Sequence, residues 1–484
     1  MPSNRPREDR PIGTTYDLIA VGGGTAGLVA AAGGAGLGAR VLLIERDRLG
    51  GECLWTGCVP SKALIASAGA ASRARRAGRL GVRTGEVSVD FAAAIAWVRE
   101  AQNRVAPHDS PERFRALGVE VVKGHARFSG SHTLRVNDRE VTARHIILAT
   151  GSRAAVPPVP GLDVVPYLTN ETLFALERLP PTLLVLGAGP IGLELAQAFA
   201  RLGSRVRVLE AASALLPRED EELAAMLGVS LAADGVEILL GHRAERVSGD
   251  AGRVAVEARS ASGDSVRLEG DALLVATGRA SNVEDLELAR AGVETGPDGI
   301  TVDDRLRTTA KNVWAAGDVI GGLRFTHVAD HEARQVLRNA LFPFARPIDY
   351  RVVPWVTYTE PELAHVGLTE REARERIGDR VRVWRRPFDD VDRAIADDER
   401  AGMVKLVTDQ RGRLLGGHVL GAGAGTMIGE IALAMRHNLP VTAIASTIHA
   451  YPTYPEAIRQ ASDAFVKSRF TGVARQVAGW LVRR

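Results

Sequence analysis

Apolar residues recur along the first part of the chain in short blocks that are separated by glycine-rich turns. The block at residues 16–21 leads into a GGGTAG turn at 22–27, an alanine-rich stretch and a second apolar block, VLLIE, at 41–45. The same order of blocks returns between residues 183 and 210. Short apolar runs bounded by turns predict buried strands, and the longer stretch between them predicts a helix. The chain therefore repeats one strand–turn–helix–strand unit.

Each repeated unit has the glycine spacing of a dinucleotide-binding turn, the GxGxxG fingerprint. The first glycine makes the tight turn, the second lets the backbone approach a pyrophosphate, and the third lets the helix pack closely on the strand. An acid ends each second strand, 23 positions after the first glycine (45 − 22 and 210 − 187), where a carboxylate accepts ribose hydroxyls. Two dinucleotide sites are predicted: Gly22, Gly24, Gly27 and Glu45 in the first, and Gly187, Gly189, Gly192 and Glu210 in the second.

Other apolar blocks end in residues that suit the edge of a ligand crevice. The blocks at 146–151 and 273–278 both end in Ala-Thr-Gly, and the block at 312–318 ends in Gly-Asp. An acid at the carboxyl end of a parallel strand faces the crevice. Thr326 is expected to be the N-cap of the next helix, whose positive end would stabilise negative charge on a bound cofactor. The crevice residues predicted from these blocks are Thr150, Gly151, Gly278, Gly317 and Asp318.

Composition narrows the classes of function. A length of 484 residues suits about three domains at roughly 100–200 residues each. The net charge is +3 and no long Lys/Arg block occurs, so neither nucleic acid nor an anionic membrane is an expected partner. No apolar run reaches the length of a membrane span, and the N-terminus lacks the apolar region of a signal peptide. We therefore expect a cytoplasmic protein.

Only two cysteines occur, Cys53 and Cys58. A zinc site would need four ligands nearby and a disulfide-stapled secreted fold would need more cysteines, so no metal site and no such framework are predicted. Two cysteines five positions apart at the start of a helix suit redox chemistry, because a helix N-terminus lowers the pKa of a thiol and the thiolate is the reactive species. Inert burial of both thiols is the alternative from the residues alone.

The stretch LGGECLWTGCVPSK at 49–62 resembles the redox motif of the class I pyridine nucleotide–disulfide oxidoreductases, which include dihydrolipoamide dehydrogenase, glutathione reductase and mercuric reductase. Both fingerprints, the Gly317-Asp318 pair and VPWVTYTEPE at 353–362 agree with that family. From about residue 347 no further fingerprint appears, and alternating strand and helix patterns predict a separate α+β domain. The resemblance covers residues 16–470.

The resemblance implies an α/β fold with two Rossmann-like dinucleotide-binding domains. An FAD domain, at residues 16–155 and 281–346, would be interrupted by an NAD(P) domain at 156–280. The C-terminal domain, at 347–484, would form a homodimer in which each active site is completed by the partner chain. Residues 1–15 are expected to form a disordered tail.

The resemblance also assigns roles around an FAD cofactor. The first fingerprint and Gly51 would contact FAD, with Glu45 on the adenosine ribose, Ala126 along the adenine and Asp318 on the ribityl chain. Thr326 would begin the helix that points at the flavin. FAD and a nicotinamide nucleotide are therefore the expected cofactors, and the other partner is a small-molecule acceptor.

The cysteines take different roles in the family. Cys58 would become the thiolate that touches the flavin, and Cys53 would become the interchange thiol that attacks the acceptor. Lys62, one helical turn after Cys58, would lie near the flavin N5 and pair with Glu194 from the helix of the second fingerprint. A charge at that position tunes the electronics of a flavin.

Glu210 bears on the choice of nicotinamide nucleotide. A carboxylate at the end of this strand accepts the ribose hydroxyls of NAD and repels the 2′-phosphate of NADP. NADH is therefore the expected reductant, and NADPH is the less favoured alternative because Arg205, Arg207 and Arg218 are close in sequence.

The C-terminal sequence departs from the family's pattern. Disulfide reductases of the family carry a His-Pro-Thr…Glu motif, whose histidine is the acid–base group of thiol exchange. Here Tyr451 precedes Pro-Thr, while Glu456 is in place. A histidine titrates near neutrality and an unperturbed tyrosine at about pH 10, so ordinary turnover of lipoamide or glutathione disulfide is called into question. His449, two positions upstream of Tyr451, is either a substitute base or a supporting hydrogen-bonded residue.

A tyrosine at this position is similar to mercuric reductase, but that enzyme also uses a C-terminal cysteine pair, and no cysteine follows Cys58. The leading hypothesis is an FAD-dependent NADH oxidoreductase that acts through the two cysteines on a disulfide, an oxidised sulfur species or a soft metal ion. One alternative is a cysteine-independent flavin reductase of quinones or oxygen. Another is a flavoprotein without turnover that senses redox state or acts as a scaffold.

Overall fold

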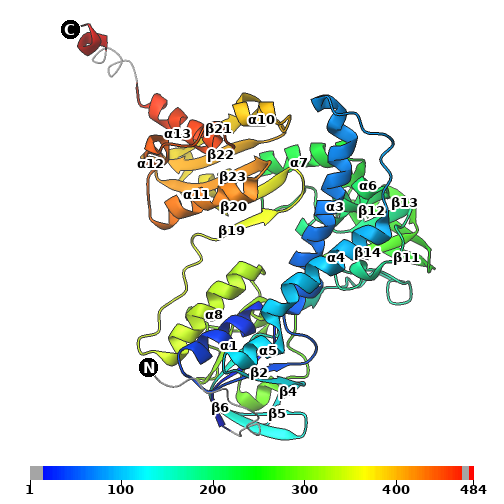
Figure 1. Cartoon of the computed structure of the whole chain (residues 1–484), viewed down its shortest axis with the longest axis vertical. Coiled ribbons are helices and arrows are strands. Elements are labelled where there is room, and N and C mark those ends of the chain that lie inside the picture. Colours follow the sequence, from blue (N-terminus) through cyan, green and yellow to red (C-terminus); the bar gives the residue numbers. More distant parts are fainter. Residues whose placement is uncertain (1–14, 471–478, 484) are drawn as a thin grey trace.

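The computed structural model describes residues 15–470 and 479–483 (Figure 1). The expected tail at 1–15 lies outside these residues, apart from Thr15, which already belongs to the first strand. Helices and strands are interspersed along the chain, and the C-terminal domain lies at the far end of the molecule from the first sheet. Among the described helices, none combines the length and the apolar character needed to cross a bilayer.

The expected FAD domain is built on one sheet that both of its segments complete. The strand order is β3-β2-β1-β6-β5-β4, and β18 from the second segment pairs with β6. Strands β1, β2, β3, β6 and β18 run parallel, whereas β4, β5 and β6 are linked as antiparallel neighbours. The strands are β1 (Thr15–Val21), β2 (Val41–Glu45), β3 (Glu120–Lys123), β4 (Ala126–Phe128), β5 (Thr133–Val136), β6 (Arg139–Leu148) and β18 (Val313–Ala315).

Two helices from distant parts of the sequence pack together on this sheet. The helix α1 (Thr25–Gly36) follows the first fingerprint turn, and α8 (Thr326–Leu341) follows the Gly-Asp pair that was predicted at a strand end. They contact each other along their length, and both bury apolar side chains in the same core cluster (Figure 1). This packing brings the N-termini of the two helices to one side of the sheet.

The expected NAD(P) domain repeats the parallel arrangement on a smaller scale. Its sheet has the order β10-β9-β8-β14, and an antiparallel meander of three strands lies beside it. The strands are β8 (Thr182–Leu186), β9 (Arg205–Leu209), β10 (Val236–Leu239), β14 (Ala272–Val275), β11 (His242–Asp250), β12 (Arg253–Ser260) and β13 (Ser265–Gly270). The helices are α6 (Pro190–Leu202) and α7 (Glu221–Ala233).

The two fingerprint turns are constructed alike. Gly22 has φ +111°, and a Cβ atom there would lie 2.2 Å from the carbonyl oxygen of Ala149; a Cβ at Gly27 would lie 1.8 Å from the oxygen of Gly22. At the second turn Gly187 has φ +103°, and a Cβ at Gly192 would lie 2.1 Å from the oxygen of Gly187. Only glycine fits where the backbone segments approach so closely. The two turns predicted from the sequence repeat therefore have the same backbone geometry.

A short antiparallel pair marks where the chain passes between the two dinucleotide domains. The strands are β7 (Ser152–Ala154) and β15 (Arg279–Ser281). The redox motif forms α2 (Gly51–Trp55) and the start of α3 (Cys58–Arg76). Helix α3 packs against α4 (Phe91–Val105) and also against α6 of the second domain. Helix α3, which begins at Cys58, therefore lies against both dinucleotide domains (Figure 1).

The C-terminal domain is an antiparallel sheet with helices on it, as the sequence predicted. The strand order is β19-β20-β23-β22-β21. The strands are β19 (Pro354–Thr357), β20 (Glu362–Gly367), β21 (Val381–Pro387), β22 (Met403–Asp409) and β23 (Leu414–Gly421). Its helices are α9 (Glu370–Ile377), α10 (Asp392–Ala396), α11 (Ala424–Arg436), α12 (Val441–Ser446) and α13 (Glu456–Ser468). The remaining elements are α5 (Pro111–Ala116), β16 (Thr295–Gly296) and β17 (Gly299–Ile300).

Candidate active site

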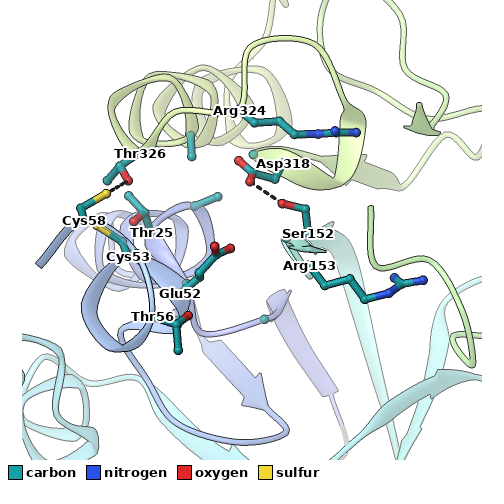
Figure 2. A pocket seen from close by; sticks show the side chains of 18 of the residues that line it. Thr25, Glu52, Cys53, Thr56, Cys58, Ser152, Arg153, Asp318, Arg324 and Thr326 are labelled. Atoms are coloured by element: carbon teal, nitrogen blue, oxygen red, sulfur yellow. Dashed lines mark hydrogen bonds between the residues drawn. The ribbon is translucent and has the colours of Figure 1, made fainter. Parts of the chain in front are cut away.

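A single large cavity of about 1580 Å³ runs from the first fingerprint turn to the cysteines (Figure 2). Its walls come from both dinucleotide domains and from the first strand of the C-terminal domain. Most of the residues predicted for the FAD site and the redox centre line it: Gly22, Gly24, Glu45, Gly51, Cys53, Cys58, Lys62, Ala126, Thr150, Gly151, Glu194, Gly317, Asp318 and Thr326. Residues that are far apart in sequence therefore meet at one site.

The two cysteines differ in position and in acidity. Cys58 is the first residue of the 19-residue helix α3 and is exposed, whereas Cys53 lies in α2 and is half-buried. A hydrogen bond from the Cys53 thiol, a contact with the Thr326 hydroxyl and the charge of Lys62 lower the pKa of Cys58 to about 6. The same hydrogen bond and burial raise the pKa of Cys53. The dithiol therefore carries its negative charge on Cys58 and its proton on Cys53.

Thr326 differs from its sequence expectation. The prediction that it is the N-cap of α8 is wrong, because Phe325 holds that position and Thr326 is the first helical residue. The Thr326 hydroxyl instead lies 3.3 Å from the sulfur of Cys58 (Figure 2). The Thr326 hydroxyl therefore contacts the Cys58 sulfur and does not cap the N-terminus of α8. The N-terminus of α8 therefore faces the redox centre, where its dipole favours negative charge.

Lys62 and Glu194 meet beside the cysteines. Lys62 Nζ donates to Glu194 Oε2 at 2.8 Å, and the Glu194 side chain is nearly buried. The other oxygen, Glu194 Oε1, accepts from the backbone N–H of Tyr358 at 2.8 Å. The Tyr358 ring lies under the ammonium group, 4.4 Å from Nζ to the ring centroid. Sequence reasoning missed Tyr358, which stands in the C-terminal motif that was used only to identify the family.

A polar network lines the middle of the cavity. Asp318 accepts from the Ser152 hydroxyl at 2.5 Å (Figure 2), and Ser152 in turn accepts from Arg279 Nε at 2.9 Å. The Arg279 guanidinium pairs with Glu52, which also accepts from Asn170. Burial raises the pKa of Glu52, while the Arg279 charge opposes that shift. Glu52 was overlooked in the sequence, because its partners Arg279 and Asn170 lie far away along the chain.

The first fingerprint leaves room for a pyrophosphate. A Cβ atom at Gly24 would approach no atom nearer than the Cα of Gly51, at 4.0 Å, and Gly51 itself has φ +56°. Glu45, at the end of β2, accepts from the backbone N–H groups of Gly23 at 2.5 Å and Asp47 at 2.7 Å. An open backbone cradle, a fixed acid and the N-terminus of α1 are the features that a dinucleotide requires, so the residues present fit FAD.

The second fingerprint has the same construction. No atom lies within 4 Å of a Cβ built on Gly189. Glu210 accepts from the N–H groups of Ala188 at 2.7 Å and Ala212 at 2.8 Å, as Glu45 does in the first site. Gly278, with φ +150°, is not among the residues that line the large cavity. The second turn therefore opens beside the cavity, next to Pro190 and Ile191, which do line it.

The C-terminal residues have separate partners. Tyr451 is exposed and its hydroxyl donates to Asp392 Oδ2 at 2.8 Å. His449 Nδ1 lies 2.9 Å from the carbonyl oxygen of Thr447, and Nε2 lies 2.9 Å from Glu430 Oε1. Each ring nitrogen of His449 therefore faces an oxygen of another residue, and neither faces the Tyr451 hydroxyl.

Glu456, the residue that would orient the family's histidine, is also engaged elsewhere. It is the first residue of α13, is buried, and accepts from Arg459 Nη2 at 2.9 Å. Within residues 15–470 and 479–483, no cluster of three or more His, Cys, Asp or Glu side chains has the geometry of a metal site.

Comparison with known proteins agrees with this geometry. Residues 16–333 match the family model described as pyridine nucleotide-disulphide oxidoreductase, and residues 353–462 match the dimerisation domain of the same family. The chain therefore belongs to the pyridine nucleotide–disulfide oxidoreductases, a family of flavoprotein enzymes that bind FAD and a pyridine nucleotide. The predicted family, fold class and enzyme class are confirmed.

Several relatives cover nearly the whole chain. A mercuric reductase from Streptomyces lividans is 37% identical over 93% of this chain and 96% of its own length. A mercuric reductase from Bacillus cereus is 36% identical over 93% of this chain and 72% of its length. A dihydrolipoyl dehydrogenase from Bacillus subtilis is 32% identical over 93% and 98%.

A solved structure of the Cu(II) complex of RclA, an HOCl-induced flavoprotein disulfide reductase from Escherichia coli, has a TM-score of 0.83. Its sequence is 32% identical, over 93% of this chain and 99% of that one. The chain is thus similar to members of the family with different acceptors.

Proposed function

We propose that this chain is an NADH-dependent flavoprotein reductase that passes electron pairs through Cys53 and Cys58 to a disulfide, an oxidised sulfur species or a soft metal ion. The observation that carries the proposal is that both thiols, the first fingerprint turn and the Lys62–Glu194 ion pair line one cavity. FAD, when bound there, supplies a centre that accepts a hydride from a nicotinamide and gives an electron pair to a disulfide.

The chain's own residues would hold the cofactor at both ends. Glu45 is fixed at the ribose position by two backbone N–H groups, and Asp318 is fixed at the ribityl position by Ser152. Ala126 offers a buried, flat surface for the adenine. The remaining contacts would come from the backbone at Gly22, Gly24, Gly27, Gly51, Thr150, Gly151, Gly317 and Thr326.

The acidity of the two thiols gives each cysteine a role. Cleavage of a Cys53–Cys58 disulfide by two electrons and one proton leaves a thiolate on Cys58 and a thiol on Cys53. This is the protonation state that their pKa values favour. Lys62 and the start of α8 stabilise the charge on Cys58, so Cys53 is the sulfur that would attack an acceptor, and its proton must leave as it does so.

Among the three acceptor classes we favour a soft metal ion. Thiol–disulfide exchange needs a proton for the departing thiolate, and here Tyr451 donates to Asp392 while both nitrogens of His449 face acceptors. Binding of a metal ion by both sulfurs releases the Cys53 proton to solvent and needs no group that protonates a departing thiolate, and soft thiolate ligands select soft ions. Relatives named as mercuric reductases and the Cu(II) complex of RclA agree with this preference.

NADH is the proposed reductant. Glu210 stands where a 2′-phosphate would be repelled, and it is held there by Ala188 and Ala212. Arg207 is one of the three nearby arginines for which NADPH was kept as an alternative. It pairs with Glu237 at 2.8 Å. Arg218 lies over the ring of Trp355, 5.7 Å from its centroid. Two of the three arginines that favoured a phosphate are thus engaged elsewhere.

A homodimer with shared active sites is also proposed, on the match of residues 353–462 to the family's dimerisation domain. Mixing a Cys53→Ser chain with a Tyr451→Phe chain tests it. With any acceptor on which both parent variants are inactive, the mixed dimer contains one site with both residues intact and recovers activity if each site uses Tyr451 from the partner chain. Equal activity of the mixture and the parents would contradict shared sites.

The function is tested with a panel of acceptors: lipoamide, glutathione disulfide, Hg²⁺, Cu²⁺ and a quinone, each with NADH and the FAD-loaded protein. We expect turnover with the metal ions to exceed turnover with the disulfides, and to be lost in Cys53→Ser. Full activity of Cys53→Ser on every acceptor would refute the thiol route and favour a cysteine-independent flavin reductase. No reduction of the bound flavin by NADH would favour the redox-sensing or scaffold alternative.

A further inference from the structure

A half-buried aromatic stack borders the cavity. Trp355 on β19 lines the cavity wall and stacks on His365 of β20, with ring centroids 3.8 Å apart and planes at 14°. Trp355 also stacks on Phe325, at 5.9 Å and 11°. Phe325 directly precedes Thr326, whose hydroxyl contacts the sulfur of Cys58. The stack therefore connects the interior of the C-terminal domain with the surroundings of the redox centre.

A carboxyl group from the second dinucleotide domain closes the other side of this stack. Glu219 is 4% exposed, and its Oε1 accepts from Trp355 Nε1 at 2.5 Å. Its second oxygen, Oε2, is buried without a hydrogen-bond partner among the described residues and lies 3.6 Å from His365 Nδ1. His365 Nδ1 is likewise buried and without a hydrogen bond to the described part of the chain. The two unpartnered atoms face each other.

The hydrogen bond made by His365 Nε2 determines whether Nδ1, the other nitrogen of the same ring, carries a proton. His365 Nε2 lies 2.8 Å from the carbonyl oxygen of Gly367, and a carbonyl only accepts, so Nε2 carries a proton. In a neutral ring Nδ1 then presents a lone pair. A lone pair and an ionised carboxylate oxygen repel each other in a buried site, and one proton between them turns this repulsion into a hydrogen bond.

We propose that Glu219 and His365 share one proton, and that this proton holds Trp355 in the wall of the active-site cavity. Glu219 and His365 are thereby positioning residues for the site. Burial raises the pKa of Glu219 to about 7 and lowers the pKa of His365 to about 3, so the proton resides on the Glu219 carboxyl at neutral pH. The pair links the second dinucleotide domain, which supplies Glu219, to the C-terminal domain, which supplies His365.

The charges around Glu219 are already engaged. Arg218 lowers the pKa of Glu219 and lies over the Trp355 ring, and Asp220 raises it. The Asp220 carboxylate accepts from Lys405 Nζ at 2.8 Å, and both side chains are buried. The same Lys405 ammonium pairs with Glu222 at 2.8 Å and with Glu370 at 3.0 Å, so Asp220 belongs to an ion-pair network centred on Lys405.

The groups around His365 do not compete with Glu219 and His365 for the shared proton. His418 meets His365 edge-on, with centroids 4.7 Å apart, and its Nε2 is directed at the carbonyl oxygen of Leu368 at 3.1 Å. Burial lowers the pKa of His418 to about 4, so both imidazoles are neutral at pH 7. Glu372 and Asp220 act on His365 only through their charge. Glu219 is therefore the group of this cluster that titrates near neutrality.

The consequence is a cavity wall that responds to pH. Below pH 7 the Glu219 carboxyl donates to His365 and accepts from the Trp355 N–H. Above pH 7 it loses its proton, and the carboxylate and the imidazole lone pair no longer attract each other. The Trp355 indole donates a hydrogen bond to Glu219 and stacks on His365, so its local environment must then change. This inference does not depend on which acceptor the enzyme uses.

The test uses the FAD-loaded protein labelled with 5-fluorotryptophan. The ¹⁹F resonance of Trp355 is identified as the one that Trp355→Phe lacks, and its shift is followed from pH 5 to pH 9. We expect one step in wild type near neutrality and no step in Glu219→Gln, whose amide donates to His365 and accepts from Trp355 at every pH. Glu221→Gln is the matched control, because Glu221 is an exposed carboxylate two positions away, at the start of α7, and it should keep the step.

A flat wild-type curve, or the same step in Glu219→Gln, would overturn the proposal. A second variant covers the case in which Glu219→Gln does not fold. His365→Gln replaces the lone pair by an amide that donates to Glu219, so the step should move to lower pH by roughly one unit or more. An unmoved step in His365→Gln would also refute the shared proton. In parallel, the rate of flavin reduction by NADH should lose a pH-dependent component in Glu219→Gln and keep it in Glu221→Gln.

Discussion

The amino group of Lys62 lies 2.8 Å from a carboxylate oxygen of Glu194, and the two residues come from different dinucleotide domains. The other oxygen of Glu194 is fixed by the backbone of Tyr358, which belongs to the C-terminal domain. Residues from three domains therefore hold one positive charge, the Lys62 ammonium, at the wall of the cavity that contains Cys58. The acidity of Cys58 depends on this arrangement.

Removal of the Lys62 charge should make Cys58 a weaker acid. In a Cys53→Ser background Cys58 is the only cysteine, so the pH dependence of its alkylation by iodoacetamide reports its pKa. Lys62→Met should raise that pKa by roughly one pH unit, because a nearby positive charge is lost. Lys62→Arg keeps the charge and should leave the value nearly unchanged. The same midpoint in the Met and Arg variants would show that Lys62 does not act on Cys58.

The Thr326 hydroxyl should make an independent contribution to the same pKa. Thr326→Val removes the hydrogen bond to the Cys58 sulfur while it keeps the shape of the side chain, so the pKa should rise by about one pH unit. Thr326→Ser retains the hydroxyl and is the control. The alkylation assay applies again, and a Val variant that titrates like the Ser variant would contradict a role for this hydroxyl.

Much of this site could be predicted from local sequence. The glycines of both fingerprints follow motifs whose spacing reflects backbone geometry, while the roles of the cysteines and the Lys62–Glu194 pairing came from the resemblance to the family. Glu52, Arg279 and Tyr358 could not be found in this way, because their partners lie far away in the sequence and are set by how the domains pack. The assignment of Thr326 failed for a related reason. A capping rule considers only the helix, and the competing partner was a sulfur 268 positions away.

The junction between α6 and the C-terminal domain should be sensitive to a single charge. Arg201 is 7% exposed, pairs with Asp234 at 2.9 Å and also pairs with Glu360. Arg201→Met would leave Asp234 without its cation and Glu360 with only the exposed Arg73, which should lower the free energy of unfolding by about 3 kcal/mol. Arg73 pairs with the same Glu360 from an exposed position, so Arg73→Met should cost less than about 1 kcal/mol. Chemical denaturation measures both, and equal losses would contradict this ranking.

Glu332 should make stability depend on pH. It is 3% exposed and accepts from Gly317 N at 2.6 Å and from the Tyr350 hydroxyl at 2.5 Å. Burial raises the pKa of Glu332 to about 7. A raised carboxyl pKa means that the folded state prefers the protonated form, so its stabilising effect is complete below about pH 4 and is lost as the pH rises through 7.

Glu332→Gln imitates the protonated carboxyl at every pH. Relative to wild type, this variant should therefore gain stability between pH 5 and pH 8, by up to about 3 kcal/mol. Thermal unfolding in a series of buffers gives the comparison. Two curves that stay parallel across this range would show that Glu332 does not titrate there.

The most direct test of the central claim is an anaerobic titration of the FAD-loaded protein with NADH, followed by flavin absorbance. If Cys53 and Cys58 form a redox-active pair beside the flavin, wild type should take up about two equivalents of NADH per FAD, one for each two-electron centre. Cys53→Ser and Cys58→Ser should each take up about one. Equal uptake by the wild type and both variants would contradict the account, because the cysteines would then lie outside the path of the electrons.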